Sequence, residues 1–166
     1  MTDPRTRTYT WQDPAETLER ARQLSGLEYL RAMARGELPG PPIAAVLGMA
    51  WPAPEDFSEG RAVFRLTPRE DLYNPIGSVH GGVYATLLDS AVGCAVQTTL
   101  PAGVGYTTLE LKVNYVRPLR VGGPEVQAVG QVVAATRQTA VAEGRLVDEA
   151  GKIYAYASTT CLILRP

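Results

Sequence analysis

The stretch from Asn74 to Asp89 contains the residues best suited to chemistry: the only histidine, a glycine pair and one isolated carboxylate. Its pattern predicts a turn followed by an apolar helix over about residues 81–99, in which Asp89 is the only charged residue. No Lys or Arg stands three or four positions from Asp89, so the carboxylate has no local partner. A helix that is apolar nearly all round is usually buried, and an unpaired charge there is costly. Asp89 is therefore the first functional candidate.

The elements that must position this helix are mostly strands. Residues 107–115 alternate between apolar and polar side chains, which predicts one half-buried strand with Thr107, Leu109 and Leu111 on the same face. Similar patterns predict strands over 62–66, 126–134, 140–146 and 152–164. Their small residues would let a helix lie close to the sheet. The predicted fold is α+β: an antiparallel sheet wrapped around one long central helix.

Residues 1–47 predict an N-terminal helical extension, and residues 48–166 the main domain. The capping signals at Asp13-Pro14 and Ser25 start two helices, and Gly36 is expected to end the second. A proline-rich break and one more helical turn over 43–47 follow. The extension is interpreted as a lid or packing arm, with a separate binding module as the alternative.

Composition excludes several classes of function. The formal net charge of −1 gives no sign of nucleic acid or a membrane surface as a partner. No apolar run reaches the roughly 20 residues of a membrane span, and the N-terminus lacks the pattern of a secretory signal, so a cytoplasmic protein is expected. Cys94 and Cys161 form no metal-binding motif; we interpret both as small buried hydrophobes, with a disulfide as a minor alternative.

Two patterns together resemble a known family. The first is Asn-x-x-Gly-x-x-His-Gly-Gly from Asn74, with Asp89 nine positions after the histidine; the second is the strand over 107–118 that ends in a proline turn. They resemble the hotdog-fold acyl-CoA thioesterases of the phenylacetate-pathway (PaaI) type, over about residues 60–164. The resemblance implies hydrolysis of an acyl- or aryl-CoA thioester without a metal or redox cofactor, by a homodimer or homotetramer. The extension is not part of the shared core.

The same resemblance assigns roles to individual residues. It implies that the Gly81 backbone N–H polarises the thioester carbonyl, that Asn74 contacts substrate or water, and that Asp89 is the base or nucleophile. His80 is expected to orient the site, although a purely structural role in the turn is equally open. Helix geometry supports the role given to Gly81, because an N–H at a helix N-terminus has no partner within the helix. Gly81 and Gly82, which lack Cβ atoms, would also let a substrate approach the backbone.

Several weaker candidates for site residues remain, some with a purely structural role as the alternative. Thr107 stands where some relatives place a serine that helps hold the attacking water, although a threonine is also common at the start of a strand. Gly93 stands one helical turn after Asp89, where some relatives carry a hydroxyl, so that hydroxyl is absent here. Tyr84 is expected either to line the acyl pocket or to belong to the core. Three arginines at predicted strand ends are candidates for the CoA phosphates: Arg117, Arg120 and Arg137.

The spacing of Gly81 and Asp89 constrains the site. Eight residues along one helix separate the two by roughly 12 Å, so one thioester carbon cannot meet groups acting from both places. Two antiparallel helices around a two-fold axis would bring Gly81 of one chain near Asp89 of the other, and would do so twice. The monomer is therefore predicted to be inactive.

Two alternatives to a thioesterase remain on this fold. A hydratase or dehydratase would need a histidine paired with a carboxylate at the acyl chain, and the only histidine precedes the glycine pair instead. A non-catalytic acyl-CoA sensor would need an output element, and the extension has no evident basic recognition helix. The preferred acyl group, and the choice between direct attack and general-base catalysis, cannot be predicted from the sequence.

Overall fold

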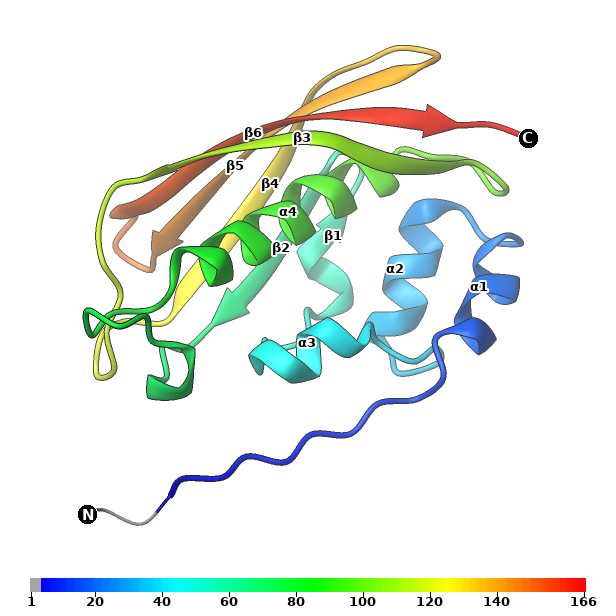
Figure 1. Ribbon diagram of the computed structural model, residues 1–166. Helices are drawn as coiled ribbons and strands as arrows, with labels where there is room; N and C mark the ends of the chain where they lie inside the picture. Colours follow the sequence, from blue (N-terminus) through cyan, green and yellow to red (C-terminus); the bar gives the residue numbers. More distant parts are fainter. Residues whose placement is uncertain (1–3) are drawn as a thin grey trace.

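The computed structural model describes residues 4–166 as an antiparallel sheet curved around one long helix (Figure 1). The sheet has six strands in the order β1-β2-β4-β5-β6-β3, and α4 (Gly81–Gln97) crosses its concave face. This confirms the α+β hotdog arrangement expected from the sequence. The strands are β1 (Phe57–Ser58), β2 (Arg61–Leu66), β3 (Gly105–Tyr115), β4 (Val126–Ala135), β5 (Thr139–Asp148) and β6 (Ile153–Leu164). Short 3-10 turns at Pro54–Asp56 and Glu70–Leu72 flank β1 and β2.

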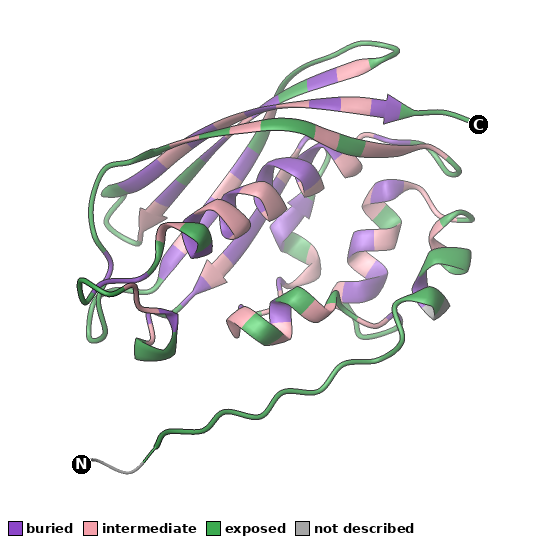
Figure 2. Cartoon of the chain, in the orientation of Figure 1, coloured by how far each residue is buried: buried purple, intermediate pink, exposed green. Residues whose placement is uncertain are grey.

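Two glycines allow α4 to approach the sheet closely. A Cβ added at Gly130 on β4 would lie 2.2 Å from the carbonyl oxygen of Ala91. A Cβ at Gly144 on β5 would lie 2.8 Å from the Val92 side chain. Larger residues at these positions would push the helix away from the sheet. The sheet-facing side of α4 is buried as a result (Figure 2).

Strand β3 departs from the single alternation that the sequence predicted. Its pairing with β6 shifts between Thr108 and Glu110, which marks a β-bulge. An extra residue in a strand moves the following side chains to the opposite face. Leu111 therefore packs into the core, whereas Leu109 is 58% exposed and Thr107 is also exposed. The prediction that Thr107, Leu109 and Leu111 share one face is wrong for this reason.

The extension forms three helices that pack against the main domain. They are α1 (Ala15–Ala21), α2 (Gly26–Ala34) and α3 (Pro42–Leu47). The Ser25 hydroxyl accepts from the Glu28 N–H at 3.3 Å, so the predicted cap of α2 is confirmed. Gly36 has a φ of 74°, the left-handed conformation expected just after a helix end.

The two cysteines are free thiols; Cys161 is buried as predicted, whereas Cys94 is only partly buried. No helix among residues 4–166 is long and apolar enough to cross a membrane. In the same part of the chain, no group of three His, Cys, Asp or Glu side chains is placed to hold a metal ion.

Candidate active site

His80 starts the central helix. It is the N-cap of α4, and its Nδ1 accepts a hydrogen bond from the Gly82 N–H at 2.9 Å. The backbone N–H of His80 donates to the Leu72 carbonyl at 2.8 Å, which fixes the preceding turn. Gly82 is exposed and borders the same hollow as His80, which is not the hollow that Gly81 borders. These contacts give His80 the structural role that the sequence left open beside a catalytic one.

The cap can be separated from catalysis by two substitutions. We expect His80→Asn to retain most activity and stability, because asparagine caps helices through its side-chain oxygen. His80→Ala removes the acceptor and should lower the free energy of unfolding by about 0.5–2 kcal/mol. Urea unfolding and kcat measured on both variants test this. A loss of turnover in His80→Asn as large as in an Asp89 variant would instead assign the imidazole a direct chemical role.

Gly81 is the first residue of α4, and its backbone N–H has no acceptor among the described residues. It borders a hollow of about 350 Å³ together with Asn74, Tyr84, Tyr115 and Arg117. A Cβ added at Gly81 would lie 3.2 Å from the Tyr115 ring, whose hydroxyl donates to the Gly81 carbonyl. The helix N-terminus thus presents an unused donor to a hollow that contains three other predicted site residues.

Asn74 and Tyr84 both shape this hollow. The Asn74 Oδ1 accepts from the N–H groups of Ile76 and Ser78, at 3.1 and 3.2 Å, and its Nδ2 donates to the Ser78 hydroxyl. One N–H of the amide therefore remains for a ligand. The Tyr84 hydroxyl donates to the Arg117 carbonyl and accepts from the Leu119 N–H, so it clamps α4 to the turn after β3. Only the ring of Tyr84 is left to contact a ligand.

Asp89 is partly buried in the middle of α4. Its Oδ1 accepts a hydrogen bond from the Thr108 hydroxyl at 3.2 Å, and no Lys or Arg of the described chain forms a salt bridge with it. The threonine beside the carboxylate is therefore Thr108, while Thr107 lies on the exposed face of β3 because of the bulge. Among the described side chains, the Thr108 hydroxyl is the only one that donates a hydrogen bond to the Asp89 carboxylate.

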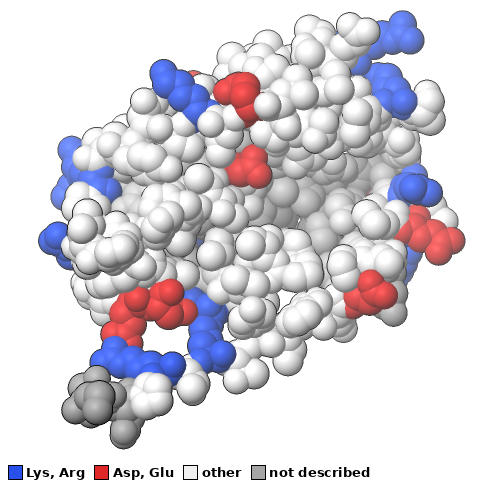
Figure 3. All heavy atoms as spheres, viewed as in Figure 1, with Lys and Arg blue, Asp and Glu red and all other residues white. Residues whose placement is uncertain are grey.

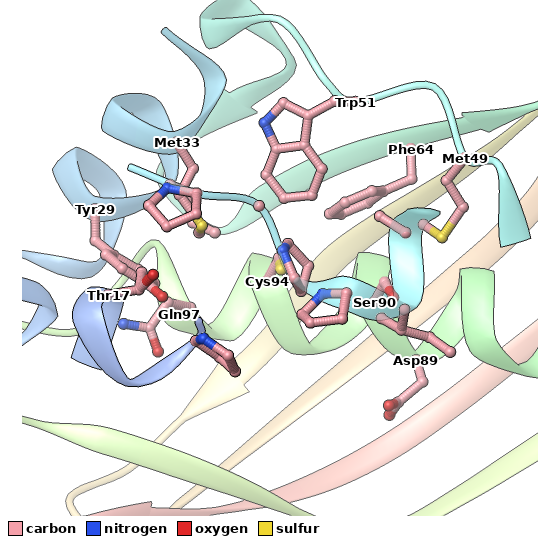
Figure 4. A pocket seen from close by; sticks show the side chains of 18 of the residues that line it. Thr17, Tyr29, Met33, Met49, Trp51, Phe64, Asp89, Ser90, Cys94 and Gln97 are labelled. Carbon is pink, nitrogen blue, oxygen red and sulfur yellow. The ribbon is translucent and has the colours of Figure 1, made fainter. Parts of the chain in front are cut away.

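Asp89 opens into a cavity of about 370 Å³ between α4 and the extension. Figure 4 shows the side chains that surround it, with Asp89 and Gln97 toward opposite ends. Most of its walls are apolar. The lining residues are Pro14, Thr17, Leu18, Tyr29, Leu30, Met33, Pro39, Gly40, Pro41, Pro42, Ile43, Ala44, Met49, Trp51, Phe64, Asp89, Ser90, Cys94, Gln97 and Tyr106.

Tyr106 and Cys94 line the cavity together with Asp89, and neither was among the predicted site residues. A Cβ at Gly93 would lie 2.5 Å from the Tyr106 hydroxyl, so the glycine makes room for that side chain. The Tyr106 hydroxyl on β3 therefore lies beside position 93, where the glycine itself has no hydroxyl. Burial and the charge of Asp89 raise the pKa of the Cys94 thiol to about 12. Cys94 therefore stays protonated near neutral pH and is a poor nucleophile.

One chain does not unite the two halves of the predicted site. Gly81 and Asn74 border one hollow, whereas Asp89 lines a different cavity. The eight helical residues between Gly81 and Asp89 correspond to roughly 12 Å along α4. Strand β3, at the edge of the sheet, pairs only with β6, which leaves one side of its backbone available to another strand.

The predicted phosphate-binding arginines lie far apart. Arg117 follows the end of β3 and borders the hollow of Gly81. Arg137 lies in the β4–β5 hairpin, at the level of the other end of β3. The neighbouring Gln138 accepts a hydrogen bond from Ile163 near the end of β6, and the next residue of β6, Leu164, pairs with Gly105 at the start of β3. Ten residues of strand separate these levels by roughly 33 Å. In one chain the two arginines cannot bind the same phosphate. Arg120 is exposed and borders neither space.

Comparisons with known proteins agree with this architecture. Residues 76–155 match the model of the thioesterase superfamily. A protein of Halobacterium salinarum named as an esterase is 36% identical over 57% of this chain and 68% of its own length. The 1,4-dihydroxy-2-naphthoyl-CoA hydrolase of Listeria monocytogenes is 25% identical over 63% of this chain and 84% of its own. A mutant structure of the phenylacetic acid degradation protein PaaI from Thermus thermophilus is 30% identical, has a TM-score of 0.65, and matches 76% of this chain and 100% of its own. By fold and sequence, the chain belongs to the thioesterase superfamily as a PaaI-like hotdog protein.

Proposed function

We propose that the protein hydrolyses an acyl- or aryl-CoA thioester to the free acid and CoA. The observation that carries the proposal is the pair of complementary groups on α4: an unused N–H at Gly81 and a carboxylate at Asp89. Thioester hydrolysis needs a donor for the carbonyl oxygen and a carboxylate that activates water or attacks directly. The relative named as a CoA hydrolase supports CoA as the thiol that is released.

In the proposed reaction, the thioester carbonyl lies at the start of α4 of one chain. The Gly81 N–H donates to the carbonyl oxygen and stabilises the negative charge that develops there. Asn74 adds the free N–H of its amide to substrate or water. Asp89 of a second chain removes a proton from water, which attacks the carbonyl carbon, or Asp89 attacks that carbon itself to form an anhydride that water then hydrolyses. In either case the C–S bond breaks and CoA leaves as a thiolate. The Thr108 hydroxyl fixes the orientation of the Asp89 carboxylate.

A site shared between two chains follows from the separation of these groups. Antiparallel pairing of two β3 edges around a two-fold axis would place the two α4 helices side by side. It would also bring Arg117 of one chain toward the end of the sheet that carries Arg137 in the other, where both could meet CoA phosphates. The homodimer, alone or as half of a homotetramer, is thus the proposed catalytic unit.

CoA release from a panel of acyl-CoAs tests the activity. We expect a thiol reagent to detect free CoA at rates well above spontaneous hydrolysis, with substrates such as octanoyl-CoA or phenylacetyl-CoA. His80 borders a different hollow from Asp89, so the only histidine is not paired with this carboxylate as hydration chemistry would need, and enoyl-CoA should show no change in its double bond. Tight binding of acyl-CoA without release of CoA from any member would favour a sensor and overturn the proposal.

A further inference from the structure

The cavity that contains Asp89 is roofed by the N-terminal extension. Tyr29 and Met33 of α2 lie on its upper side, where Trp51 joins them from just beyond the extension (Figure 4). Pro42 at the start of α3 also lines the cavity. The match to the thioesterase superfamily begins at residue 76. The roof therefore lies outside the matched region, while Asp89 on the floor lies within it. Residues of the extension are in a position to define what fits above Asp89.

This roof is held firmly in place. The Gly26 N–H donates to the Leu100 carbonyl at 2.9 Å, and a Cβ at Gly26 would lie only 1.7 Å from the Gln97 carbonyl oxygen. The start of α2 thus packs directly on the end of α4. Arg31 donates to the Phe57 carbonyl at 3.0 Å, which ties α2 to β1 as well. Because both ties involve backbone atoms, α2 forms a fixed wall and not a loose cover.

The cavity has a direction. Its floor on α4 runs from Asp89 and Ser90 past Cys94 to Gln97, roughly 12 Å along the helix. Tyr29 and Met33 lie toward the Gln97 end (Figure 4). An acyl group whose thioester carbon lies at Asp89 would extend along α4 beneath α2. Its far end would meet side chains of the extension.

The walls select by charge and by size. Among the lining residues that the structure describes, only Asp89 is charged, and Lys and Arg side chains lie mostly at the edges of the face that includes this hollow (Figure 3). A second carboxylate on the acyl group would lose its water without gaining a cationic partner among the described lining residues. A cavity of about 150 Å³ already accepts benzene, and this one is about 370 Å³. An acetyl group would leave most of the apolar wall without contacts.

We infer that this cavity binds the acyl group and that the extension restricts it to uncharged, apolar groups of medium length, such as octanoyl. The inference rests on the proposed function and adds a substrate class to it. Met33 on the roof and Cys94 on the floor are the specificity-determining residues, since one closes the far end and the other lies midway along the path.

Two substitutions should move the preference in opposite directions. Cys94→Phe fills the middle of the cavity and should lower kcat/KM for octanoyl-CoA by roughly tenfold or more, with butyryl-CoA little changed. Met33→Ala enlarges the far end of the cavity. It should raise the ratio of kcat/KM for dodecanoyl-CoA to kcat/KM for hexanoyl-CoA by roughly tenfold. Glu28→Ala is the matched control, because Glu28 is on α2 but does not line the cavity. Wild-type protein should prefer octanoyl-CoA over both acetyl-CoA and glutaryl-CoA.

The outcomes separate this inference from the proposed function. If no thioester is hydrolysed, the proposed function fails; binding of octanoyl-CoA, seen by Trp51 fluorescence in a Trp11→Phe background and weakened in Cys94→Phe, would still support the cavity. If thioesters are hydrolysed but neither variant changes the ratio between chain lengths, the cavity inference is wrong and the activity stands. Equal turnover of glutaryl-CoA and hexanoyl-CoA would also overturn it. A Met33→Ala variant that does not fold leaves the test to Cys94→Phe.

Discussion

Asp89→Asn should reduce kcat by roughly a hundredfold or more while the protein still binds acyl-CoA. The substitution keeps the size and shape of the side chain but removes the charge that activates water or attacks the carbonyl. The Thr108 hydroxyl can still donate to the amide oxygen, so the local packing should survive. Steady-state kinetics with the best substrate of the panel and a binding isotherm for the same thioester measure the two effects separately.

The appropriate control makes the same chemical change elsewhere. Glu149→Gln alters an exposed carboxylate in the turn between β5 and β6, away from both hollows, and should leave kcat unchanged. If Asp89→Asn retains turnover comparable to this control, the chemistry belongs to another group. Single-turnover hydrolysis in oxygen-18 water then distinguishes two mechanisms for the wild-type protein: label recovered in Asp89 indicates direct attack, and its absence indicates a general base.

Local signals predicted the central helix and its start well. The apolar run with one charge gave α4 at Gly81–Gln97, two residues shorter than expected at its C-terminal end. The small residues at Gly130 and Gly144 correctly indicated a helix lying close on the sheet. These features depend on neighbours in sequence or on volume, which residue types reveal directly.

The partners of Asp89 could not be predicted in this way. A β-bulge between Thr108 and Glu110 decides which threonine faces the helix, and no residue type in β3 marks the extra residue. Tyr106 fills the space beside Gly93 for a similar reason, because the contact depends on strand register. The alternation over 107–115 would have placed both on the wrong face.

The cavity is a product of tertiary packing. Its walls come from the extension, from β2 and β3, and from α4, which are distant in the chain. The sequence indicated helices in the extension, but not which element they would cover. The contact of Gly26 with Gln97 and Leu100 places the extension over the end of α4. A glycine at the start of a helix does not by itself predict such a close approach.

The largest recovery of activity is expected from mixing two inactive variants. Gly81→Pro removes the backbone N–H directly, and proline suits the first position of a helix after the extended His80. Losing one such donor should cost about a hundredfold to a thousandfold in kcat. Gly81→Ala, which keeps the N–H but meets Tyr115 at 3.2 Å, is the control for crowding and should be the less impaired of the two.

Gly81→Pro and Asp89→Asn chains should complement each other if each site takes Gly81 from one chain and Asp89 from its partner. In a freely exchanged one-to-one mixture, a site is intact when an Asp89→Asn chain supplies the glycine and a Gly81→Pro chain supplies the acid. This arrangement occurs at about a quarter of all sites, so about a quarter of wild-type activity should return. Subunit exchange is verified independently with chains of different mass. If exchange is complete and activity stays at the level of the separate variants, both groups act within one chain, and the eight helical residues between them would have to be bridged in some other way.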